Sequence, residues 1–370
     1  MSSWRILVVD DEAGMLRSVQ RVLGQDYKVA ATRSSREAFG LTREFKPDLA
    51  ILDIQMSEMD GFQLMEELRA LDPELDVILM TGSIHELDAK LIRAIRKDAF
   101  YFLQKPFDRG VLLSLVERCL ERKQLDRSNR QHLLRMEKEL GDARAFQHSM
   151  LPPGSAEVGG IFVCAHYIPC TELGGDFYDY AALPSEGAVI VVADVSGHGA
   201  SAAMLTGVVK SAFHSASADA YEPICVVERV ASATRAFGDH HFISLICARV
   251  RNGSLDFVNA GHPPGILSNV KTQAPLLEGT GPIISPAFDG SWEQSTVPVQ
   301  RGSDRIVLFT DGLTEADSES GDFGLARLVE EVGKRAIDGN TLSERILESV
   351  RRFAAGRSFK DDLTLVVADL

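Results

Sequence analysis

Five short apolar runs alternate with helical stretches over the first 107 residues, and this alternation restricts the fold more than any other feature. The runs are ILVV (6–9), YKVA (27–30), LAIL (49–52), VILM (77–80) and FYFL (100–103). The helical stretch before the last run covers about residues 85–97, and another follows it. Strands that are apolar throughout are buried on both faces, and strands separated by helices pair in parallel. We therefore predict a doubly wound α/β domain with a five-stranded parallel sheet.

Polar residues follow the ends of these strands, where ligands bind in such sheets. Asp10 and Asp11 follow the first run, Asp53 the third, Thr81 the fourth and Lys105 the fifth. Three carboxylates at one sheet edge repel one another unless a cation lies between them, and oxygen donors alone favour Mg²⁺ or Mn²⁺. The pattern predicts phosphoryl transfer to an aspartate, with a metal ion and the lysine neutralising the developing charge.

These five positions resemble the receiver domains of two-component response regulators, and their agreement favours this family over a flavodoxin-like domain with unrelated acids. The resemblance implies that Asp53 accepts a phosphoryl group, and that Mg²⁺ binds beside it. The residues that it assigns to Mg²⁺ are Asp10, Asp11, Asp53 and, through its backbone carbonyl, Gln55. Those that it places around the phosphoryl group are Thr81, Lys105 and, at the aromatic switch position, Phe102. Ser57 stands where the family usually has proline, and we expect only a subtle effect from this difference.

Residues 108–150 are polar, and we predict a helix that ends before Pro152-Pro153. About eight of twelve positions on a heptad seam are apolar, which indicates a marginal coiled coil, stronger in its second half. The seam positions are Leu112, Cys119, Asp126, Leu133, Leu140 and Gln147, and Leu115, Arg122, Asn129, Met136, Ala143 and Met150. A buried Asn129 would set the register of a parallel homodimer. The alternative is a single helix lying on the surface of a domain.

Strand-like stretches outnumber helices after residue 151. They are IFVCAHYIP (161–169), AVIVVADV (188–195), FISLICARV (242–250), SLDFVNAG (254–261), DRIVLFTDG (304–312) and LTLVVADL (363–370). Helical stretches cover about 200–213, 222–237 and 341–353, and another follows Phe323. Because strands and helices form separate blocks, we predict an α+β layered domain in which a β-sandwich is flanked by helices.

Carboxylates in this part of the chain gather in four segments that we interpret as turns. They are GGDFYD (174–179), ADVSGHG (193–199), TDGLTEA (310–316) and KDDLT (360–364). Together they could form one oxygen-rich pocket for two hard divalent cations, and not for zinc, since no histidine–cysteine set accompanies them. Two such cations can activate a water molecule and clamp a phosphate for in-line attack.

These segments resemble the PPM-type metal-dependent serine/threonine protein phosphatases, in particular the bacterial RsbU/SpoIIE-like branch that governs sigma-factor switches. The resemblance implies that Asp194 bridges two Mn²⁺ or Mg²⁺ ions and that Val195 offers its backbone carbonyl. It assigns Asp176 to the second ion, and Asp311 and Asp361 to the first. Spacing alone leaves Asp361 and Asp362 open as alternatives. His198 is a candidate general acid for the leaving alkoxide, or it only shapes the turn.

Composition limits the partners and the compartment. The net charge of −14 argues against direct contact with nucleic acid as the main function. No apolar run reaches the roughly 20 residues of a membrane span, and we see no signal peptide. The spacing of the five cysteines does not indicate a disulfide framework, so we expect reduced thiols and a cytoplasmic protein.

The sequence thus favours three parts: a receiver domain (1–122), a helical linker (123–151) and a PPM-type phosphatase domain (152–370). The resemblance implies that an upstream histidine kinase or phosphotransfer protein loads Asp53. It also implies that the phosphatase acts on a phosphorylated anti-sigma factor antagonist. The alternative is a non-enzymatic adaptor that binds a sigma factor, an anti-sigma factor or another regulator through the PPM-like domain. Degenerate adaptors lose metal ligands, whereas all the expected aspartates are present here, which favours an enzyme.

Overall fold

The computed structural model describes residues 4–82, 101–197, 199–237, 241–268, 275–287, 289–319, 321–334 and 336–370. The chain divides into two compact units, residues 1–135 and 136–370. The helix expected at about 85–97 lies outside the described residues. No described helix combines the length and the apolar character that a membrane crossing requires.

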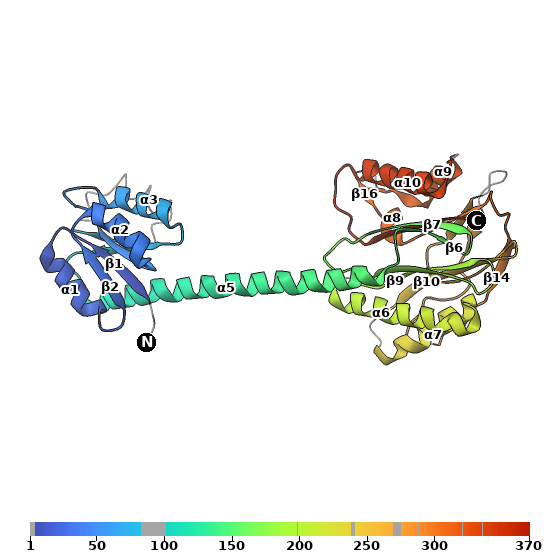
Figure 1. The fold of residues 1–370 in the computed structure, drawn as a ribbon, viewed down its shortest axis with the longest axis horizontal. Helices are drawn as coiled ribbons and strands as arrows, with labels where there is room; N and C mark the ends of the chain where they lie inside the picture. Colours follow the sequence, from blue (N-terminus) through green and yellow to red (C-terminus); the bar gives the residue numbers. More distant parts are fainter. Residues whose placement is uncertain are drawn as a thin grey trace. The chain divides into compact units, whose positions relative to one another are not determined.

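The first unit is the predicted doubly wound domain, with the strand order β2-β1-β3-β4-β5 and parallel pairing throughout. Its strands are β1 (Arg5–Val9), β2 (Lys28–Thr32), β3 (Leu49–Asp53), β4 (Asp76–Thr81) and β5 (Tyr101–Gln104). Its short helices are α1 (Ala13–Leu23), α2 (Ser35–Phe45) and α3 (Gly61–Leu71). Figure 1 shows β1 and β2 of this sheet with the helices α1, α2 and α3 around it. Residues of α2 and α3 pack on one face of the sheet, and residues of α1 and of the helix after β5 pack on the other. This double covering explains why the strands are apolar throughout.

A single helix, α5 (Arg109–Met150), covers nearly all of the stretch 108–150 that we predicted as helical. Its first part belongs to the core of the first unit, where Leu112 and Cys119 are buried. Its last turn belongs to the second unit, where Gln147 is buried. Seam positions between these two parts are exposed: Leu133 by 60%, Met136 by 58% and Leu140 by 41%. The two ends of the apolar seam therefore pack within the two units. Its middle stretch, from Leu133 to Leu140, is exposed and could contact a partner.

The second unit contains two mainly antiparallel sheets, packed face to face. The first sheet has the order β14 (Ser295–Pro298), β11 (Ser254–Ala260), β10 (Ile243–Arg251), β9 (Ala188–Val195) and β8 (Asp176–Ala182). The second has the order β13 (Leu276–Leu277), β12 (Gly265–Ser268), β15 (Arg305–Phe309), β18 (Leu363–Asp369), β7 (Ile161–Ile168) and β6 (Ser155–Val158). A small hairpin is formed by β16 (Asp317–Ser318) and β17 (Gly321–Asp322).

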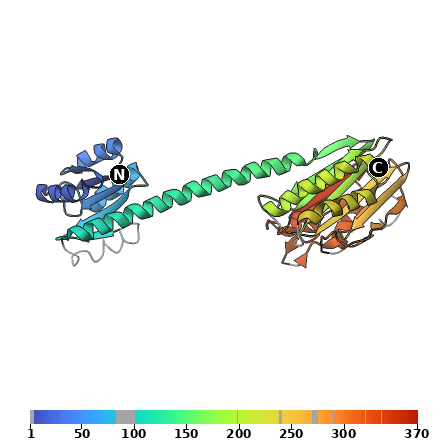
Figure 2. The same cartoon turned by 90° about the horizontal axis from the view of Figure 1, so that it is seen from below.

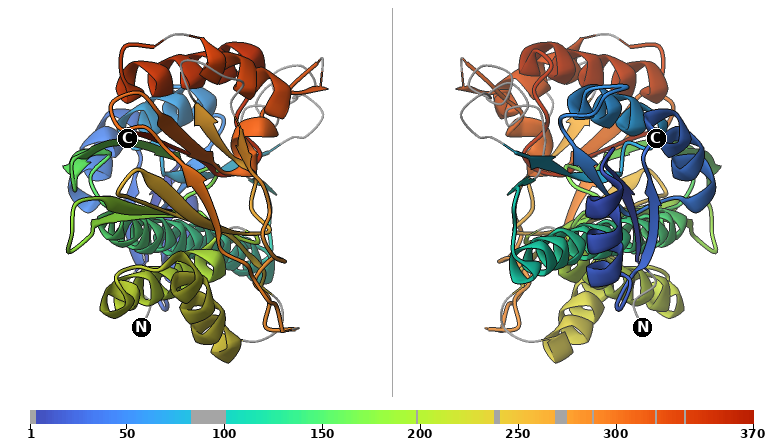
Figure 3. Two further views of the ribbon diagram at one scale, coloured as in Figure 1. Left: turned by 90° about the vertical axis from the view of Figure 1, so that its right-hand side faces the viewer. Right: turned by 90° about the vertical axis from the view of Figure 1, so that its left-hand side faces the viewer.

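Helices cover the outer faces of both sheets, as predicted. The first sheet is covered by α6 (Ala200–Ser215) and α7 (Pro223–Thr234), which are followed by the 3₁₀ turns η1 (Ala216–Asp219) and η2 (Arg235–Phe237). The second sheet is covered by α8 (Asp311–Thr314), α9 (Gly324–Gly333) and α10 (Gly339–Ala354). Figure 3 shows this unit with the red helices and the yellow helices on opposite sides of the strands, and Figure 2 shows α6 and α7 lying across their sheet. The layers are thus helix, sheet, sheet, helix.

The interpretation of the acidic segments as turns was wrong in three cases. Asp194 lies within β9, and Asp311 is the first residue of α8. The segment GGDFYD was interpreted as a turn, but Asp176 is the first residue of the strand β8, and Asp179 lies within it. The residues of β8 from Asp176 to Tyr180 are all buried. Its glycines and acids resemble a turn only because this strand begins at a polar site.

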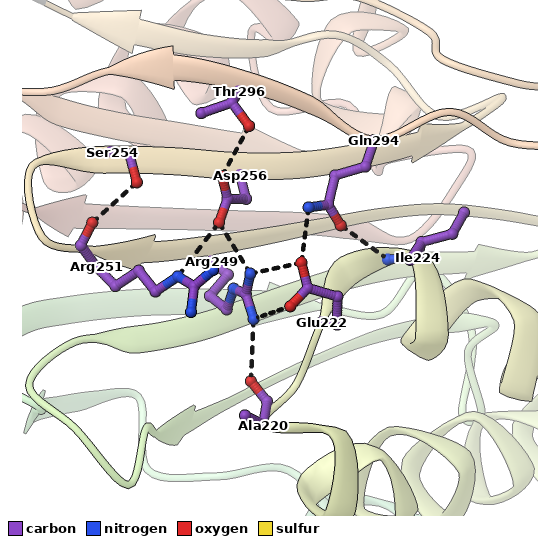
Figure 4. Close-up of polar contacts among 9 residues, drawn as sticks. All are labelled: Ala220, Glu222, Ile224, Arg249, Arg251, Ser254, Asp256, Gln294 and Thr296. Atoms are coloured by element: carbon purple, nitrogen blue, oxygen red, sulfur yellow. Dashed lines mark hydrogen bonds and ion pairs between the residues drawn. The ribbon is translucent and has the colours of Figure 1, made fainter.

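A buried ion-pair network lies where the first sheet meets the start of α7 (Figure 4). The guanidinium of Arg249 on β10 is only 1% exposed and binds the carboxylates of Glu222 and Asp256, the latter at 2.9 Å. Asp256 also accepts a hydrogen bond of 2.8 Å from Thr296 on β14. Burying a charge is costly unless it is paired, so these partners are what allows an arginine inside this domain.

Candidate functional sites

The first candidate site lies at the carboxyl edge of the parallel sheet. Asp10, Asp11 and Asp53 each place a carboxylate oxygen there, and these oxygens lie within 4.8 Å of one another. Asp10 and Asp53 are buried. Lys105 reaches both of them, with its Nζ 2.7 Å from Asp10 Oδ2 and 3.0 Å from Asp53 Oδ2. The structure therefore brings together four of the residues that the sequence placed at this edge.

Burial raises the pKa of Asp53, and the negative charge of Asp10 acts in the same direction, whereas Lys105 opposes them. A carboxyl group that is crowded by another carboxyl group favours a nearby cation. Three oxygen donors around one point are the donor set that Mg²⁺ prefers. The residues of this site therefore fit the metal ion that the resemblance implies.

The remaining predicted receiver residues lie close by in the fold. Thr81 ends β4 and pairs in register with Gln104 of β5. Phe102 lies in β5 and packs, partly buried, against the core on the α2 and α3 side of the sheet. Gln55 is exposed in the loop after β3. The Ser57 N–H donates a 3.2 Å hydrogen bond to Asp11 Oδ2, which a proline at this position could not do because it has no N–H.

The second candidate site lies at one end of the β-sandwich. Asp176 begins β8 and Asp194 is near the end of β9, and the two are register partners in this antiparallel pair. Asp311 follows β15, and Asp361 precedes β18, which is also antiparallel to β15. In an antiparallel pair the end of one strand lies beside the start of the next. The fold thus explains how acids up to 185 positions apart in the sequence come to lie at the same end of the domain.

Burial and neighbouring negative charges raise the pKa of Asp194 and of Asp311. Burial raises the pKa of Asp194 to about 7, helped by the charges of Asp311, Asp361, Asp362 and Glu315. Burial also raises the pKa of Asp311, and the charge of Asp361 adds to this effect. Such mutual repulsion is relieved by divalent cations, and oxygen-only donors suit Mg²⁺ or Mn²⁺. The residues at this site fit these ions.

Asp176 is held by two hydroxyl groups that the sequence analysis did not single out. Thr310 Oγ1 donates to Asp176 Oδ2 at 2.7 Å, and Thr364 Oγ1 donates to the same oxygen at 2.6 Å. Burial raises the pKa of Asp176 far above its usual range, and the charge of Asp194 adds to this effect. Both threonines lie inside the acidic motifs TDG and DDLT. Their position next to the acids was the sequence signal that could have identified them as site residues.

Asp361 and Asp362 differ in their surroundings. Asp362 is buried and accepts two backbone hydrogen bonds, from Cys170 N at 2.8 Å and from Gly175 N at 2.6 Å. Gly175 approaches β9 so closely that a Cβ atom on it would lie 2.3 Å from the carbonyl oxygen of Val195. Asp362 therefore holds the loop before Asp176 in place, which leaves Asp361 as the better candidate for a cation ligand.

Two further polar residues border this site. His262 is buried, and its Nδ1 lies 2.7 Å from the Oγ of Ser244, the register partner of Asp194. Gln147, from the last turn of α5, donates through Nε2 to the carbonyl of Gly174 at 2.7 Å and accepts from its N–H at 3.3 Å. His198 lies outside the described residues.

Comparisons with known proteins agree with both domains. Residues 6–117 match the family model of the response regulator receiver domain. Residues 184–370, half of the chain, match that of Stage II sporulation protein E, or SpoIIE. The chain belongs to the SpoIIE family. It is a receiver domain fused to a PP2C-like, SpoIIE-type phosphatase domain.

Solved structures support the fold of the second domain. The SiaA-PP2C domain of Pseudomonas aeruginosa is similar with a TM-score of 0.55 and 21% identity, over 65% of this chain and 98% of that one. The RsbU and RsbW domains of Rv1364c from Mycobacterium tuberculosis are similar with a TM-score of 0.50 and 25% identity, over 58% of this chain and 62% of that one.

Curated relatives match a shorter part of the chain. The transcriptional regulatory protein GlrR of Escherichia coli is 34% identical over 117 residues, which are 31% of this chain and 26% of GlrR. The DNA-binding transcriptional regulator NtrC of Proteus hauseri is 30% identical over 151 residues, which are 40% of this chain and 32% of NtrC. This chain thus spans about a quarter to a third of the length of these relatives.

Proposed function

We propose that this protein is a response regulator whose Asp53 phosphorylation controls a metal-dependent phosphoserine/phosphothreonine phosphatase. The observation that carries the proposal is the meeting of Asp194, Asp311 and Asp361 at one end of a SpoIIE-type fold, where burial and the neighbouring negative charges raise the pKa of Asp194 and of Asp311. The proposed parts are a receiver (1–122), a linker (123–151) and a phosphatase domain (152–370). The protein acts in the cytoplasm.

The contacts of Asp10, Asp53 and Lys105 at the sheet edge support the proposed receiver roles. Asp53 accepts the phosphoryl group from a histidine kinase or a phosphotransfer protein. Mg²⁺ would be held by Asp10, Asp11, Asp53 and the backbone carbonyl of Gln55. Lys105, which already contacts Asp10 and Asp53, would bind the incoming phosphoryl oxygens together with Thr81. Phe102 is the aromatic switch.

The phosphatase roles follow from the acids at the end of the sandwich. Asp194 would bridge two Mn²⁺ or Mg²⁺ ions, with the carbonyl of Val195 beside it. Asp311 and Asp361 would hold one ion. Asp176, oriented by hydrogen bonds from Thr310 and Thr364, would lie on the side of the other ion. Such ions supply activation of a water molecule and charge neutralisation at the phosphate. His198 is the candidate general acid.

The proposed substrate is a phosphoserine on an antagonist of an anti-sigma factor, within a partner-switching stress pathway. Partners on this path are the antagonist, the anti-sigma factor or a sigma factor. The protein acts as a homodimer through α5, whose exposed seam residues Leu133, Met136 and Leu140 would pair with those of a second copy.

Release of phosphate from a phosphoserine protein tests the enzyme. The wild type, with Mn²⁺ or Mg²⁺, is expected to release phosphate, and Asp194→Ala is expected to abolish the release. Asp289→Ala is a matched control, since the side chain of Asp289 is 89% exposed and pairs with Arg235. If the wild type, like Asp194→Ala, releases no phosphate with any metal ion, even after phosphorylation of Asp53, the enzyme hypothesis is rejected in favour of the adaptor.

Labelling by acetyl phosphate tests the receiver separately. Asp53→Asn is expected to abolish the incorporation of phosphate, because the substitution removes the carboxylate that is proposed to accept the phosphoryl group. Labelling that persists in Asp53→Asn would show that the acceptor is another residue.

A further inference from the structure

Cys170 lies beside the phosphatase acids, although it belongs to none of the acidic motifs. It follows β7, which pairs with β18 so that Ile168 lies opposite Leu363, and this pairing brings the loop to the start of β18. The N–H of Cys170 donates to Asp362 Oδ1 at 2.8 Å. The Sγ of Cys170 and one carboxylate oxygen each of Asp361 and Asp362 lie within 4.8 Å of one another. The sequence argued against zinc here because no histidine–cysteine set accompanies the acids, but the fold adds a sulfur donor to them.

A sulfur donor changes which cation such a cluster prefers. Mg²⁺ and Mn²⁺ select oxygen donors, whereas thiolate ligands select softer ions such as Zn²⁺. Zinc binds sulfur at about 2.3 Å and carboxylate oxygen at about 2.0–2.2 Å, in a tetrahedron. Ligand atoms in such a site are about 3.3–3.6 Å apart. Small side-chain rotations would therefore close the cluster around one ion.

Asp362 can take part without giving up its backbone hydrogen bonds. Its Oδ1 accepts from Cys170 N and its Oδ2 from Gly175 N, and each carboxylate oxygen has two lone pairs. One lone pair on each oxygen thus stays available to a cation. The two N–H donors also fix the carboxylate in position, as the outer hydrogen bonds of metal ligands do.

An unsatisfied hydroxyl group borders the same cluster. The Oη of Tyr167 is buried, and within the described part of the chain it has no hydrogen-bond partner. A Cβ atom on Gly174 would lie 2.2 Å from this Oη and 2.4 Å from Asp362 Oδ2, so both oxygens pack against Gly174 and lie close to each other. Buried polar atoms without partners are rare in native proteins, and a bound ion or its water ligand is one explanation.

We propose that Cys170, Asp361 and Asp362 form a binding site for a thiophilic divalent cation, Zn²⁺ foremost, and that occupation of this site inhibits the phosphatase. On binding, the S–H bond of Cys170 breaks, a Zn–S bond forms and the proton leaves to solvent, so nothing is oxidised or reduced. The fourth position of the tetrahedron is left to water. The inhibitory effect rests on the proposed function, in which Asp361 holds a catalytic ion, because both ions would draw on the same carboxylate.

Cobalt(II) tests the binding site independently of activity, since a cobalt–thiolate bond gives a charge-transfer absorption in the near ultraviolet. The reduced full-length protein titrated with Co²⁺ is expected to show this band at one equivalent, and Zn²⁺ is expected to remove it. Cys170→Ser is expected to lose the band. Cys225→Ser is the matched control, since Cys225 is the other partly exposed cysteine and lies in α7. A wild type without the band, or a Cys170→Ser variant that keeps it, would overturn the site.

Two further measurements complete the test. Asp361→Asn is expected to weaken Zn²⁺ binding at least tenfold while the cobalt–thiolate band persists, and unchanged affinity would remove Asp361 from the site. Zn²⁺ is expected to inhibit the Mn²⁺-dependent activity, and Cys170→Ser should raise the half-inhibitory concentration at least tenfold. Equal inhibition of both proteins would refute the inhibitory role. If the wild type has no activity with any metal ion, the proposed function fails, while the cobalt titration still decides the binding site.

Discussion

Replacing Asp362 with asparagine is expected to destabilise the phosphatase domain, whereas the same change at Asp361 is expected to remove activity. The two residues are neighbours in sequence, yet only Asp362 is bound by two backbone N–H groups, at 2.8 Å and 2.6 Å. The contrast therefore separates a carboxylate that holds a loop from one that holds the catalytic cation.

The magnitude follows from these two hydrogen bonds. A hydrogen bond to a charged group contributes about 1.5–3 kcal/mol, and a buried N–H left without an acceptor costs a similar amount. Asparagine keeps one acceptor oxygen but turns an NH₂ group toward the other N–H. Asp362→Asn should therefore lower the free energy of unfolding by about 1.5–3 kcal/mol, while Asp361→Asn should stay within about 0.5 kcal/mol of the wild type in EDTA.

The chain offers a simple probe for this measurement. It has two tryptophans, Trp4 in the first unit and Trp292 in the second. In a Trp4→Phe background, the fluorescence of Trp292 reports on urea unfolding of the phosphatase domain alone, which avoids treating a two-domain chain as one transition. Equal loss of stability in both variants, or none in Asp362→Asn, would refute the assigned roles.

Activity provides the second half of the contrast. A catalytic cation contributes several kcal/mol to the transition state, and 1.36 kcal/mol is a factor of ten. Asp361→Asn should therefore lower the Mn²⁺-dependent rate at least about 100-fold, with its stability intact. A rate near that of the wild type would exclude Asp361 as a ligand.

Three other predictions concern pH, assembly and packing. In EDTA, Asp194 should stabilise the fold below pH 4 and lose this effect as pH rises through about 7, because its folded-state pKa is raised above the usual 3.8; Asp194→Asn should flatten the pH dependence of urea unfolding. Leu133→Glu with Leu140→Glu should shift the molar mass in light scattering from dimer to monomer, whereas Leu134→Glu, equally exposed but off the seam, should not. Arg249→Met should lower the free energy of unfolding by about 3–5 kcal/mol, because it leaves two carboxylates without their buried partner; thermal unfolding of the phosphatase domain measures this loss.

Much of the architecture could be predicted because it depends on local patterns. Apolar runs that alternate with helices give the parallel sheet, and acids at strand ends mark its site. The start of β8 could not be assigned in this way, since Asp176 follows two glycines and has the composition of a turn. Its buried position depends on pairing with β9, which lies in the following segment of the chain.

Contacts between distant segments could not be predicted from the sequence for the same reason. The choice between Asp361 and Asp362 depends on which of them faces the N–H of Gly175, nearly two hundred residues earlier. The hydroxyl groups of Thr310 and Thr364 share one oxygen of Asp176 only after three strands have come together. Spacing within a motif carries no information on such tertiary geometry.

Through Gln147, the last turn of α5 helps to hold the loop before Asp176 in place. Its amide group satisfies both main-chain groups of Gly174, as a neighbouring strand would do in a sheet. Helix ends fray at low cost in free energy, and local opening of this kind exposes whatever the helix end was covering. When the last turn of α5 opens, the peptide groups of Gly174 lose their partners one residue before Gly175 and two before Asp176. Amide hydrogen exchange at Gly174 should therefore follow the exchange of the helix end, not that of the sandwich core.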